Sequence, residues 1–330
     1  MRLAPRAAGA LAGLLACLLA ACGQPPARPA APAQAAATAA LPREGYIHVP
    51  GGRIWYARMG DGPGTPLVVI HGGPGSASYG LKVWGALGDE RPVIRYDQLG
   101  AGKADHPTDT TLFTVARAVR ELQALRDSLG LSEVHLYGRS WGAMVVEAYM
   151  GTHPAGVRSV ILSSPLVTTA QWERDADSLV RTLPDSMQRA IARHEAAGTT
   201  NSAEYRAAMA AYYARYVRRL PPRSPADADS AAHPGGDLVY SYMWGPSEFA
   251  ATGTLKHFDG TAWLREIRVP TLFLAGEHDE ATPASTARFA RLVPGAEFRV
   301  IPGSGHATEN DNPDALLATV RDFLHRVERR

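Results

Sequence analysis

The chain has 330 residues, of which 45% are apolar and 20% are charged, as is ordinary for a soluble globular enzyme. Its 34 basic and 32 acidic residues leave a formal net charge of +2, which is too small for the basic footprint of a nucleic-acid-binding protein. At this length the chain can bury a substantial core and hold one large domain with an insertion.

The first 22 residues predict an export signal rather than part of the fold. Arg2 and Arg6 form a basic start, and residues 7–21 form an apolar run that is too short to span a bilayer as a helix. The run ends in Leu-Ala-Ala followed by Cys22, which resembles the lipobox of bacterial lipoproteins. That resemblance implies a lipidated Cys22 as the first mature residue. The alternative is an ordinary signal peptide with a cysteine near its cleavage site.

The next segment predicts a tether. Residues 23–43 are mostly Ala, Pro and Gln and have no hydrophobic periodicity, so they cannot bury a core. The two cysteines of the chain, Cys17 and Cys22, precede this segment, so the mature protein would contain no disulfide. We therefore expect an exported protein, held by a lipid anchor in the bacterial cell envelope on its periplasmic or extracellular face.

From residue 44 onward, strand patterns alternate with helical ones. This alternation predicts a mostly parallel sheet with helices on both faces, begun by an antiparallel hairpin. Strands are expected at residues 46–49, 53–58, 67–70, 92–96, 134–137, 158–162, 271–275 and 298–301, and helices at 115–129, 143–150 and 313–327.

One stretch, residues 168–263, breaks this rhythm. It contains helical patterns at 186–197 and 202–220, a proline-rich turn at Pro221-Pro222, and no clear strand. We expect it to form a helical cap inserted between two strands, which leaves 44–167 and 264–330 as the core of the fold.

The most informative motif is Gly138-Arg139-Ser140-Trp141-Gly142, between a predicted strand and a predicted helix. A serine between two glycines at such a turn is typical of the nucleophile elbow of an α/β-hydrolase, which is the fold class that we predict. The turn lifts the hydroxyl above the sheet, and the helix N-terminus behind it favours developing negative charge.

A serine nucleophile needs a base and a group that orients the base, and in this fold they follow in the order serine, acid, histidine. Asp279 follows the strand at 271–275, and His306 follows the strand at 298–301. Both therefore lie at the carboxyl ends of strands, where open α/β sheets place their sites. We predict a catalytic triad of Ser140, Asp279 and His306.

The oxyanion hole is predicted from His71-Gly72-Gly73-Pro74-Gly75, which follows the strand at 67–70. Glycines let backbone amides approach the substrate oxygen, and we assign the hole to the N–H groups of Gly73 and Trp141. The chain lacks a His-Glu-x-x-His pattern, and no metal or other cofactor is expected.

Several of these motifs together resemble the proline iminopeptidase family, which includes the prolyl aminopeptidases and the tricorn-interacting aminopeptidase. The resemblance runs from about Glu44 to the C-terminus. It is carried by residues 71–75 (HGGPG), 96–102 (YDQLGAG), 138–142 (GRSWG), 276–283 (GEHDEATP) and 244–249 (WGPSEF).

This resemblance implies a serine aminopeptidase that releases an N-terminal residue, possibly proline, from peptides or amino-acid amides. It also implies that Glu248 of the cap and Glu280 beside the acid hold the free ammonium of the substrate, through charge-assisted hydrogen bonds. The chain departs from the usual family pattern at Arg139, where glycine is common, and at Ala101, Lys103 and Ala104. These departures bear on the substrate more than on the mechanism.

Two other functions remain open at this point. One is an esterase or amidase for small acyl substrates with the same triad, because this architecture hosts many chemistries. The other is a surface binding protein on a hydrolase scaffold, against which the intact triad argues. The preferred N-terminal residue and the oligomeric state stay undetermined.

Overall fold

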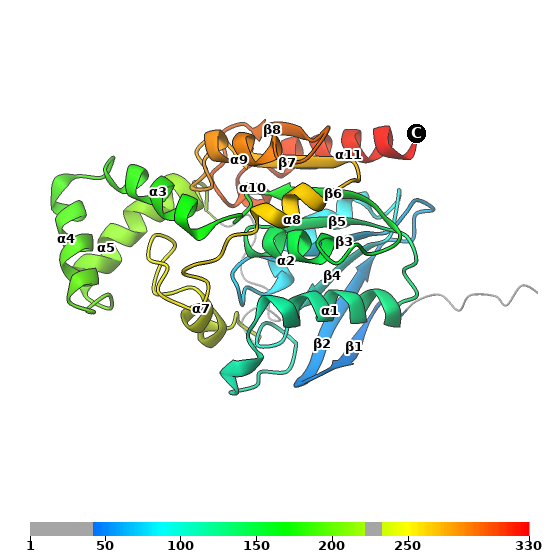
Figure 1. The fold of residues 1–330 in the computed structure, drawn as a ribbon, viewed down its shortest axis with the longest axis horizontal. Coiled ribbons are helices and arrows are strands. Elements are labelled where there is room, and N and C mark those ends of the chain that lie inside the picture. Colours follow the sequence, from blue (N-terminus) through cyan, green and yellow to red (C-terminus); the bar gives the residue numbers. More distant parts are fainter. Residues whose placement is uncertain (1–41, 222–232, 330) are drawn as a thin grey trace, which may run out of the picture. The chain divides into compact units, whose positions relative to one another are not determined.

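The structure is a computed structural model, which describes residues 42–221 and 233–329. Its centre is an eight-stranded sheet in the order β1-β2-β4-β3-β5-β6-β7-β8 (Figure 1). β2 runs antiparallel to both of its neighbours, and the strands from β4 to β8 are parallel. The strands are β1 Glu44–Val49, β2 Gly52–Met59, β3 Leu67–Ile70, β4 Val93–Asp97, β5 Val134–Arg139, β6 Val157–Ser163, β7 Thr271–Gly276 and β8 Glu297–Ile301.

The described helices and helical turns connect these strands. They are η1 Ser78–Leu87, η2 Thr110–Leu112, α1 Val115–Ser128, α2 Trp141–Met150, α3 Thr169–Val180, α4 Asp185–Ala196, α5 Ala203–Tyr212, η3 Tyr213–Val217, α7 Asp237–Met243, α8 Thr261–Glu266, α9 Pro283–Ala290, α10 Thr308–Asp311 and α11 Pro313–Glu328. Each predicted strand begins within two residues of its expected start, and the predicted α/β-hydrolase architecture is confirmed.

Apolar side chains of the parallel strands fill two cores, one on each face of the sheet. Within β5, Leu136 packs with α1 and α2, whereas its neighbour Tyr137 packs with η1 and α11. Successive side chains of a strand point to opposite faces, so a strand covered on both sides must be apolar throughout. The four residues of β3 are accordingly all buried. This packing fixes the carboxyl ends of the strands, where the predicted site residues lie.

The insertion between β6 and β7 forms the cap, whose helices α3, α4 and α5 are drawn in green at the left of Figure 1. Its two ends meet at an isolated bridge between Thr168 and Asp259, and α8 beyond the bridge packs against α2. The insertion therefore closes slightly before the predicted boundary at 263. A small core of its own joins α3, α4 and α5, with Leu183, Ile191 and Tyr205 at its centre.

The helix expected at 202–220 is shorter than predicted. α5 ends at Tyr212, a π-helical turn covers Tyr213–Val217, and the backbone of Arg218 is extended. The carbonyl groups of Tyr216 and Val217 accept hydrogen bonds from the loop that carries His306. These tertiary contacts replace the local bonds that would continue the α-helix. Pro222, in the turn predicted at this point, lies outside the described residues.

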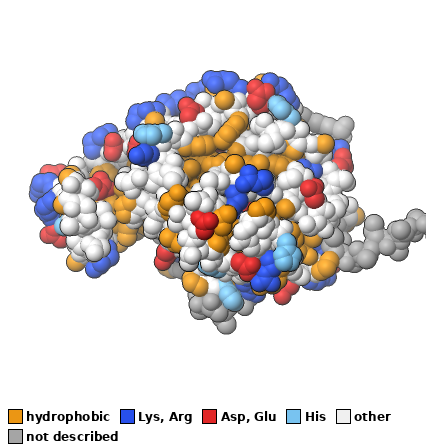
Figure 2. Space-filling model, turned by 60° about the horizontal axis from the view of Figure 1, so that its bottom comes forward, with side chains coloured by type: hydrophobic (Ala, Val, Ile, Leu, Met, Phe, Trp, Pro, Cys, Tyr) orange, Lys and Arg blue, Asp and Glu red, His pale blue; other side chains and the backbone are white. Residues whose placement is uncertain are grey.

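Charges of both signs are spread over the surface. On the face drawn in Figure 2, Lys and Arg side chains lie among Asp and Glu side chains, in keeping with the net charge of +2. Within the part of the chain that the structure describes, no helix combines the length and apolarity needed to cross a bilayer.

One buried carboxyl group of α2 has no visible function. Glu147 is fully buried, and neither of its carboxylate oxygens has a hydrogen-bond partner. Gly260 packs closely on one of these oxygens, because a Cβ at that position would stand 2.9 Å from it. Burial raises the pKa of Glu147 well above its usual value, so the folded protein holds this group neutral.

This pKa shift predicts a loss of stability as the pH rises. The unfolded chain releases the Glu147 proton near pH 4.5, whereas the folded chain keeps it, so folding costs about 1.4 kcal/mol more per pH unit until the folded pKa is reached. Glu147→Gln keeps the neutral shape and should raise Tm by several degrees near neutral pH, at roughly 2–4 °C per kcal/mol. Thermal unfolding should show no gain at about pH 4, and none at either pH for the exposed control Glu266→Gln. A gain independent of pH would contradict the assignment.

Candidate active site

Ser140 occupies the sharp turn between β5 and α2. Its backbone has φ 54° and ψ −120°, a strained conformation for a non-glycine residue. The flanking glycines allow the close crossing, because a Cβ on Gly138 would stand 2.3 Å from the carbonyl oxygen of Gly142, and one on Gly142 would stand 2.4 Å from that of Ile70. The backbone N–H of Ser140 donates to the carbonyl of Ser163 over 2.9 Å. The predicted nucleophile therefore lies on a rigid support.

Asp279 and His306 contact each other in the loops that follow β7 and β8. The Nδ1 atom of His306 lies 2.8 Å from Oδ1 of Asp279, and both side chains are buried. Asp279 also accepts hydrogen bonds from the hydroxyl of Ser164 over 2.5 Å and from the backbone N–H groups of Gly276 and Ala281. These bonds fix the carboxylate in orientation. The contact with the Asp279 carboxylate favours the tautomer of neutral His306 that carries its proton on Nδ1. Nε2 is then free to accept a proton from the serine.

The predicted oxyanion donors belong to two segments next to Ser140: Trp141 follows it, and a Cβ on Gly72, the neighbour of Gly73, would stand 3.3 Å from the Cβ of Ser140. Trp141 is the first residue of α2, and the first N–H groups of a helix have no acceptor within it. The Trp141 indole N–H donates to Gln98 over 2.9 Å, and the N–H of Gln98 donates to Nε2 of His71 over 3.3 Å. Burial lowers the pKa of His71, so this histidine stays neutral. The loop of Gly73 and the elbow are thus joined by Gln98.

Two further carboxylates lie close to the histidine. Glu280 is 1% exposed and its Oε1 is 4.0 Å from Nδ1 of His306. Its oxygens interact with the Tyr212 hydroxyl but accept no hydrogen bond of good geometry from the described residues. Burial, followed by the charges of Glu248 and Asp279, raises the pKa of Glu280 well above its usual value. Burial also raises the pKa of Glu248, and the nearby His306 opposes that shift.

Aromatic side chains surround this pair of glutamates. The edge of the Trp172 ring packs against His306 at 5.5 Å between centroids, and its indole N–H donates to the carbonyl of Glu248 over 2.8 Å. The buried hydroxyls of Tyr212 and Tyr240 interact with Glu280 and Glu248, respectively, without a hydrogen bond of good geometry, and burial together with the two carboxylates raises the pKa of both phenols. The site therefore contains buried polar groups with unused hydrogen-bonding capacity, which a bound polar group would satisfy.

Arg139 lies next to the nucleophile but pairs away from it. Its Nε atom is 3.6 Å from Glu309, which also accepts the hydroxyl of Tyr137 over 2.6 Å. Burial would lower the pKa of Arg139, but the carboxylate of Glu309 and, more weakly, those of Asp279 and Glu248 raise it. The guanidinium thus stays charged beside Glu309.

The other departures from the family pattern fold around Asp97. This buried carboxylate accepts the backbone N–H of Lys103 over 2.9 Å and that of Ser78 over 2.7 Å. Ala101 and Ala104 are buried in the same loop. The replaced residues therefore shape the loop at the end of β4.

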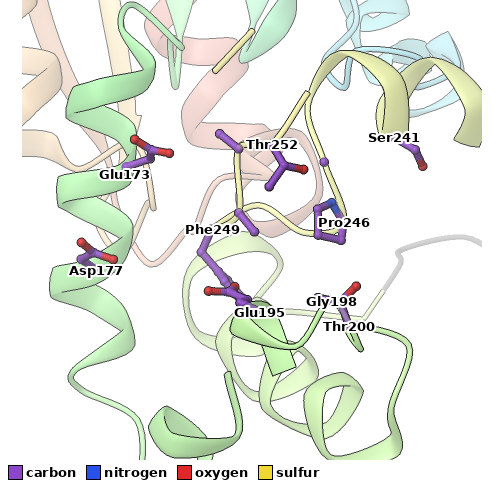
Figure 3. Close-up of a pocket in the computed structure, with 12 residues that line it drawn as sticks. Glu173, Asp177, Glu195, Gly198, Thr200, Ser241, Pro246, Phe249 and Thr252 are labelled. Atoms are coloured by element: carbon purple, nitrogen blue, oxygen red, sulfur yellow. The ribbon is translucent and has the colours of Figure 1, made fainter. Parts of the chain in front are cut away.

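The cap also carries an acidic pocket of about 680 Å³. Figure 3 shows Glu173 and Asp177 one turn apart on α3, with Glu195 of α4 across the pocket. Part of its wall is the loop Gly245–Thr252, which also contains Glu248. In residues 42–221 and 233–329, no three His, Cys, Asp or Glu side chains are grouped so as to hold a metal ion.

Sequence reasoning missed the residues that support the site. Ser164 anchors Asp279 and has a positive φ of 49°, but a serine after a strand carries no signal of that role. Trp172 and the tyrosines at 212 and 240 come from three separate cap segments, and only the fold brings them together. Gln98 belongs to a motif of the resemblance, and its place at a strand end is the one signal that pointed to it.

Comparison with known proteins identifies the family. Residues 65–312 match the alpha/beta hydrolase fold family. A proline iminopeptidase of Heyndrickxia coagulans is 43% identical over 286 residues, which cover 86% of this chain and 99% of that protein. The chain belongs to the proline iminopeptidase family. This confirms the resemblance inferred from the motifs.

Solved structures agree with this assignment. The crystal structure of proline iminopeptidase from Mycobacterium smegmatis has a TM-score of 0.78 and 33% identity, and the match covers 86% of this chain and 98% of that one. The esterase RhEst1 from Rhodococcus sp. ECU1013 has a TM-score of 0.61 and 21% identity, over 86% of this chain and 98% of that one. At that identity the likeness shows the fold alone.

Proposed function

We propose that this member of the proline iminopeptidase family removes an N-terminal residue, with a preference for proline, through the triad of Ser140, His306 and Asp279. His306 takes the proton of Ser140 as its oxygen attacks the carbonyl carbon. The N–H groups of Gly73 and Trp141 stabilise the oxyanion. His306 then gives the proton to the leaving amine, and water releases the N-terminal residue from the acyl-enzyme.

The observation that carries the aminopeptidase assignment is the pair Glu248 and Glu280. Two carboxyl groups buried beside the catalytic histidine are costly unless a positive charge joins them. The Tyr212 hydroxyl interacts with the Glu280 carboxyl group, but among the described residues no hydrogen bond of good geometry occupies its oxygens, so they can accept donors from a ligand. A substrate ammonium supplies both the charge and the missing hydrogen-bond donors. An endopeptidase or a lipase meets no such group on its substrate.

The preference for proline follows from the named relatives and fits the same pair. The protonated ring nitrogen of an N-terminal proline carries two N–H donors. Each N–H group can be accepted by one of the two carboxylates. The aromatic residues Trp172, Tyr212 and Tyr240 provide an apolar wall for the pyrrolidine ring. The esterase alternative is less supported, because a neutral ester has no use for two buried anions near the acyl group.

A panel of substrates tests this function directly. Purified protein should cleave prolyl-arylamide with a kcat/KM at least tenfold above that for alanyl- or leucyl-arylamide. N-acetylated prolyl-arylamide should be nearly inert, because acetylation removes the ammonium charge. p-Nitrophenyl esters of short acids serve as the matched neutral substrates. Equal cleavage of free and acetylated amides, with faster ester hydrolysis, would favour the esterase instead.

We also propose that the chain is exported and anchored to a membrane of the cell envelope through a lipid on Cys22. The support is the sequence of residues 2–22, which lies outside the described residues. The Ala- and Pro-rich segment 23–43 would then hold the enzyme away from the membrane surface. A lipid-anchored peptidase would act on peptides outside the cytoplasm.

Cys22→Ser tests the anchor. The wild-type protein should sediment with membranes, because several acyl chains on one cysteine hold firmly, and the variant should move to the soluble fraction. Cys17→Ser is the matched control and should leave the distribution unchanged. Mass spectrometry of the mature N-terminus provides the second readout. An intact N-terminus at Met1, or an unmodified Cys22 in the mature protein, would refute the proposal.

A further inference from the structure

Two backbone hydrogen bonds join the loop of the catalytic histidine to the cap. The N–H of His306 donates to the carbonyl of Tyr216 over 2.8 Å, and the N–H of Ala307 donates to the carbonyl of Val217 over 2.7 Å. Both carbonyls belong to η3, and π-helical turns of this kind frequently occur at functional sites. A Cβ on Gly305 would stand only 2.8 Å from the Tyr216 oxygen, so the two segments touch through their backbones.

Asp311 holds both segments from one side. Its carboxylate accepts the backbone N–H groups of Gly305 over 2.9 Å, Arg219 over 3.1 Å and Leu220 over 3.0 Å. Asp311 is 5% exposed, and burial alone would raise its pKa, but the hydrogen bonds keep that pKa below its usual value. One ionised side chain thus ties the residue before His306 to the cap.

The same cap segment reaches the pair of glutamates. Tyr212 ends α5 beside Glu280, and the hydroxyl of Tyr213 accepts the N–H of Glu248 over 3.2 Å. Residues 212–220 therefore contact the proposed ammonium pocket at one end and the loop of His306 at the other. We call these residues the docking segment.

We propose that Asp311 is a positioning residue that aligns His306 by seating the docking segment against its loop. The proposal rests on the proposed function for the identity of the catalytic histidine. Without the carboxylate, the three N–H groups lose their shared acceptor, and the loop of His306 is less often in place for proton transfer. Because the acyl-enzyme chemistry slows but the glutamates remain, kcat falls while KM changes little.

The test compares Asp311→Asn with the exposed control Asp314→Asn. Both oxygens of the Asp311 carboxylate accept backbone N–H groups, whereas the amide of Asn has one oxygen and one NH₂ group. In the variant the NH₂ group therefore faces a backbone N–H, and that hydrogen bond is lost. We expect kcat on prolyl-arylamide to fall roughly ten- to a hundredfold, with KM within about twofold. Hydrolysis of a neutral aryl ester and labelling of Ser140 by a fluorophosphonate should slow by the same factor, because both need His306 but no ammonium. Each assay is run well below the measured Tm.

A second variant keeps the test decisive if Asp311→Asn does not fold. Asn310→Ala removes hydrogen bonds from the side-chain amide to the carbonyls of Leu220 and Pro221 and one to Oδ1 of Asp311, but it keeps the Asp311 carboxylate itself. It should slow the same three reactions by a smaller factor. A folded Asp311→Asn with all three rates within about twofold of wild type would overturn the proposal, and so would an unchanged Asn310→Ala if it alone folds. Should the protein fail to cleave arylamides at all, the ester and labelling reactions still decide the role of Asp311.

Discussion

Ser140→Ala should lower kcat by roughly four to six orders of magnitude, the scale on which the removal of a triad nucleophile acts in serine hydrolases. His306→Ala should cost about as much, and Asp279→Asn somewhat less. The three losses should not add, because the three side chains act as one unit and the loss of any one disables the proton transfer that the others serve. Steady-state kinetics on prolyl-arylamide, with a single-turnover measurement for the slow variants, gives these values.

The losses of activity report on catalysis only if the triad variants keep the fold of the wild-type protein. Ser178→Ala, an exposed serine of α3, is the matched control and should keep full activity. A fluorophosphonate should label wild-type protein at Ser140 alone, and Ser140→Ala should not be labelled. Far-UV circular dichroism should be unchanged in all variants. Near-full activity of Ser140→Ala would show that another group is the nucleophile.

Glu280→Gln and Glu248→Gln should each lower kcat/KM for free-amine substrates roughly ten- to a hundredfold, since each removes one charged partner of the ammonium. Both variants should hydrolyse a neutral aryl ester at the wild-type rate. Acetylated substrates, already poor for the wild type, should not become worse. Glu266→Gln, an exposed glutamate of α8, is the control for the substitution.

The pH profile separates the same two classes of substrate. A carboxyl group with a raised pKa is neutral at mildly acidic pH and binds an ammonium only after it has lost its proton. The ratio of kcat/KM for prolyl-arylamide to that for the ester should therefore rise with pH on the acidic side. The double variant Glu248→Gln/Glu280→Gln should show a flat ratio. If the variants lose free-amine and neutral substrates equally, the glutamates are structural.

The strand ends made the predicted triad visible in the sequence. Ser140 directly follows an apolar strand, Asp279 and His306 lie in the loops just after theirs, and parallel strands bring their carboxyl ends to one edge. The structure places Asp279 and His306 in hydrogen-bond contact and Ser140 at the strained turn. Their roles, and those of Gly73, Trp141 and the two glutamates, stay predictions until the variants are assayed.

Other features depend on contacts that no local pattern encodes. The helical periodicity of residues 202–220 predicted one continuous helix, but hydrogen bonds to the loop of His306 open it into a π-helical turn at Tyr213. Asp311 binds backbone N–H groups of residues far away in the sequence, and a backbone partner can be any residue type. Such roles become visible only when distant segments are placed side by side.

The closed base of the cap has a consequence for how this enzyme can change over evolution. Thr168 and Asp259 pair where the insertion leaves and rejoins the sheet, and the Ser164–Asp279 hydrogen bond spans 115 residues of sequence. For a flexible loop, doubling the length between two fixed ends costs only about 0.6 kcal/mol in closure entropy. Closure entropy therefore places only a small cost on an insertion of different length, provided that its helices still bury a core of their own. The docking segment restricts that freedom, because any replacement must still present two carbonyl groups to the loop of His306.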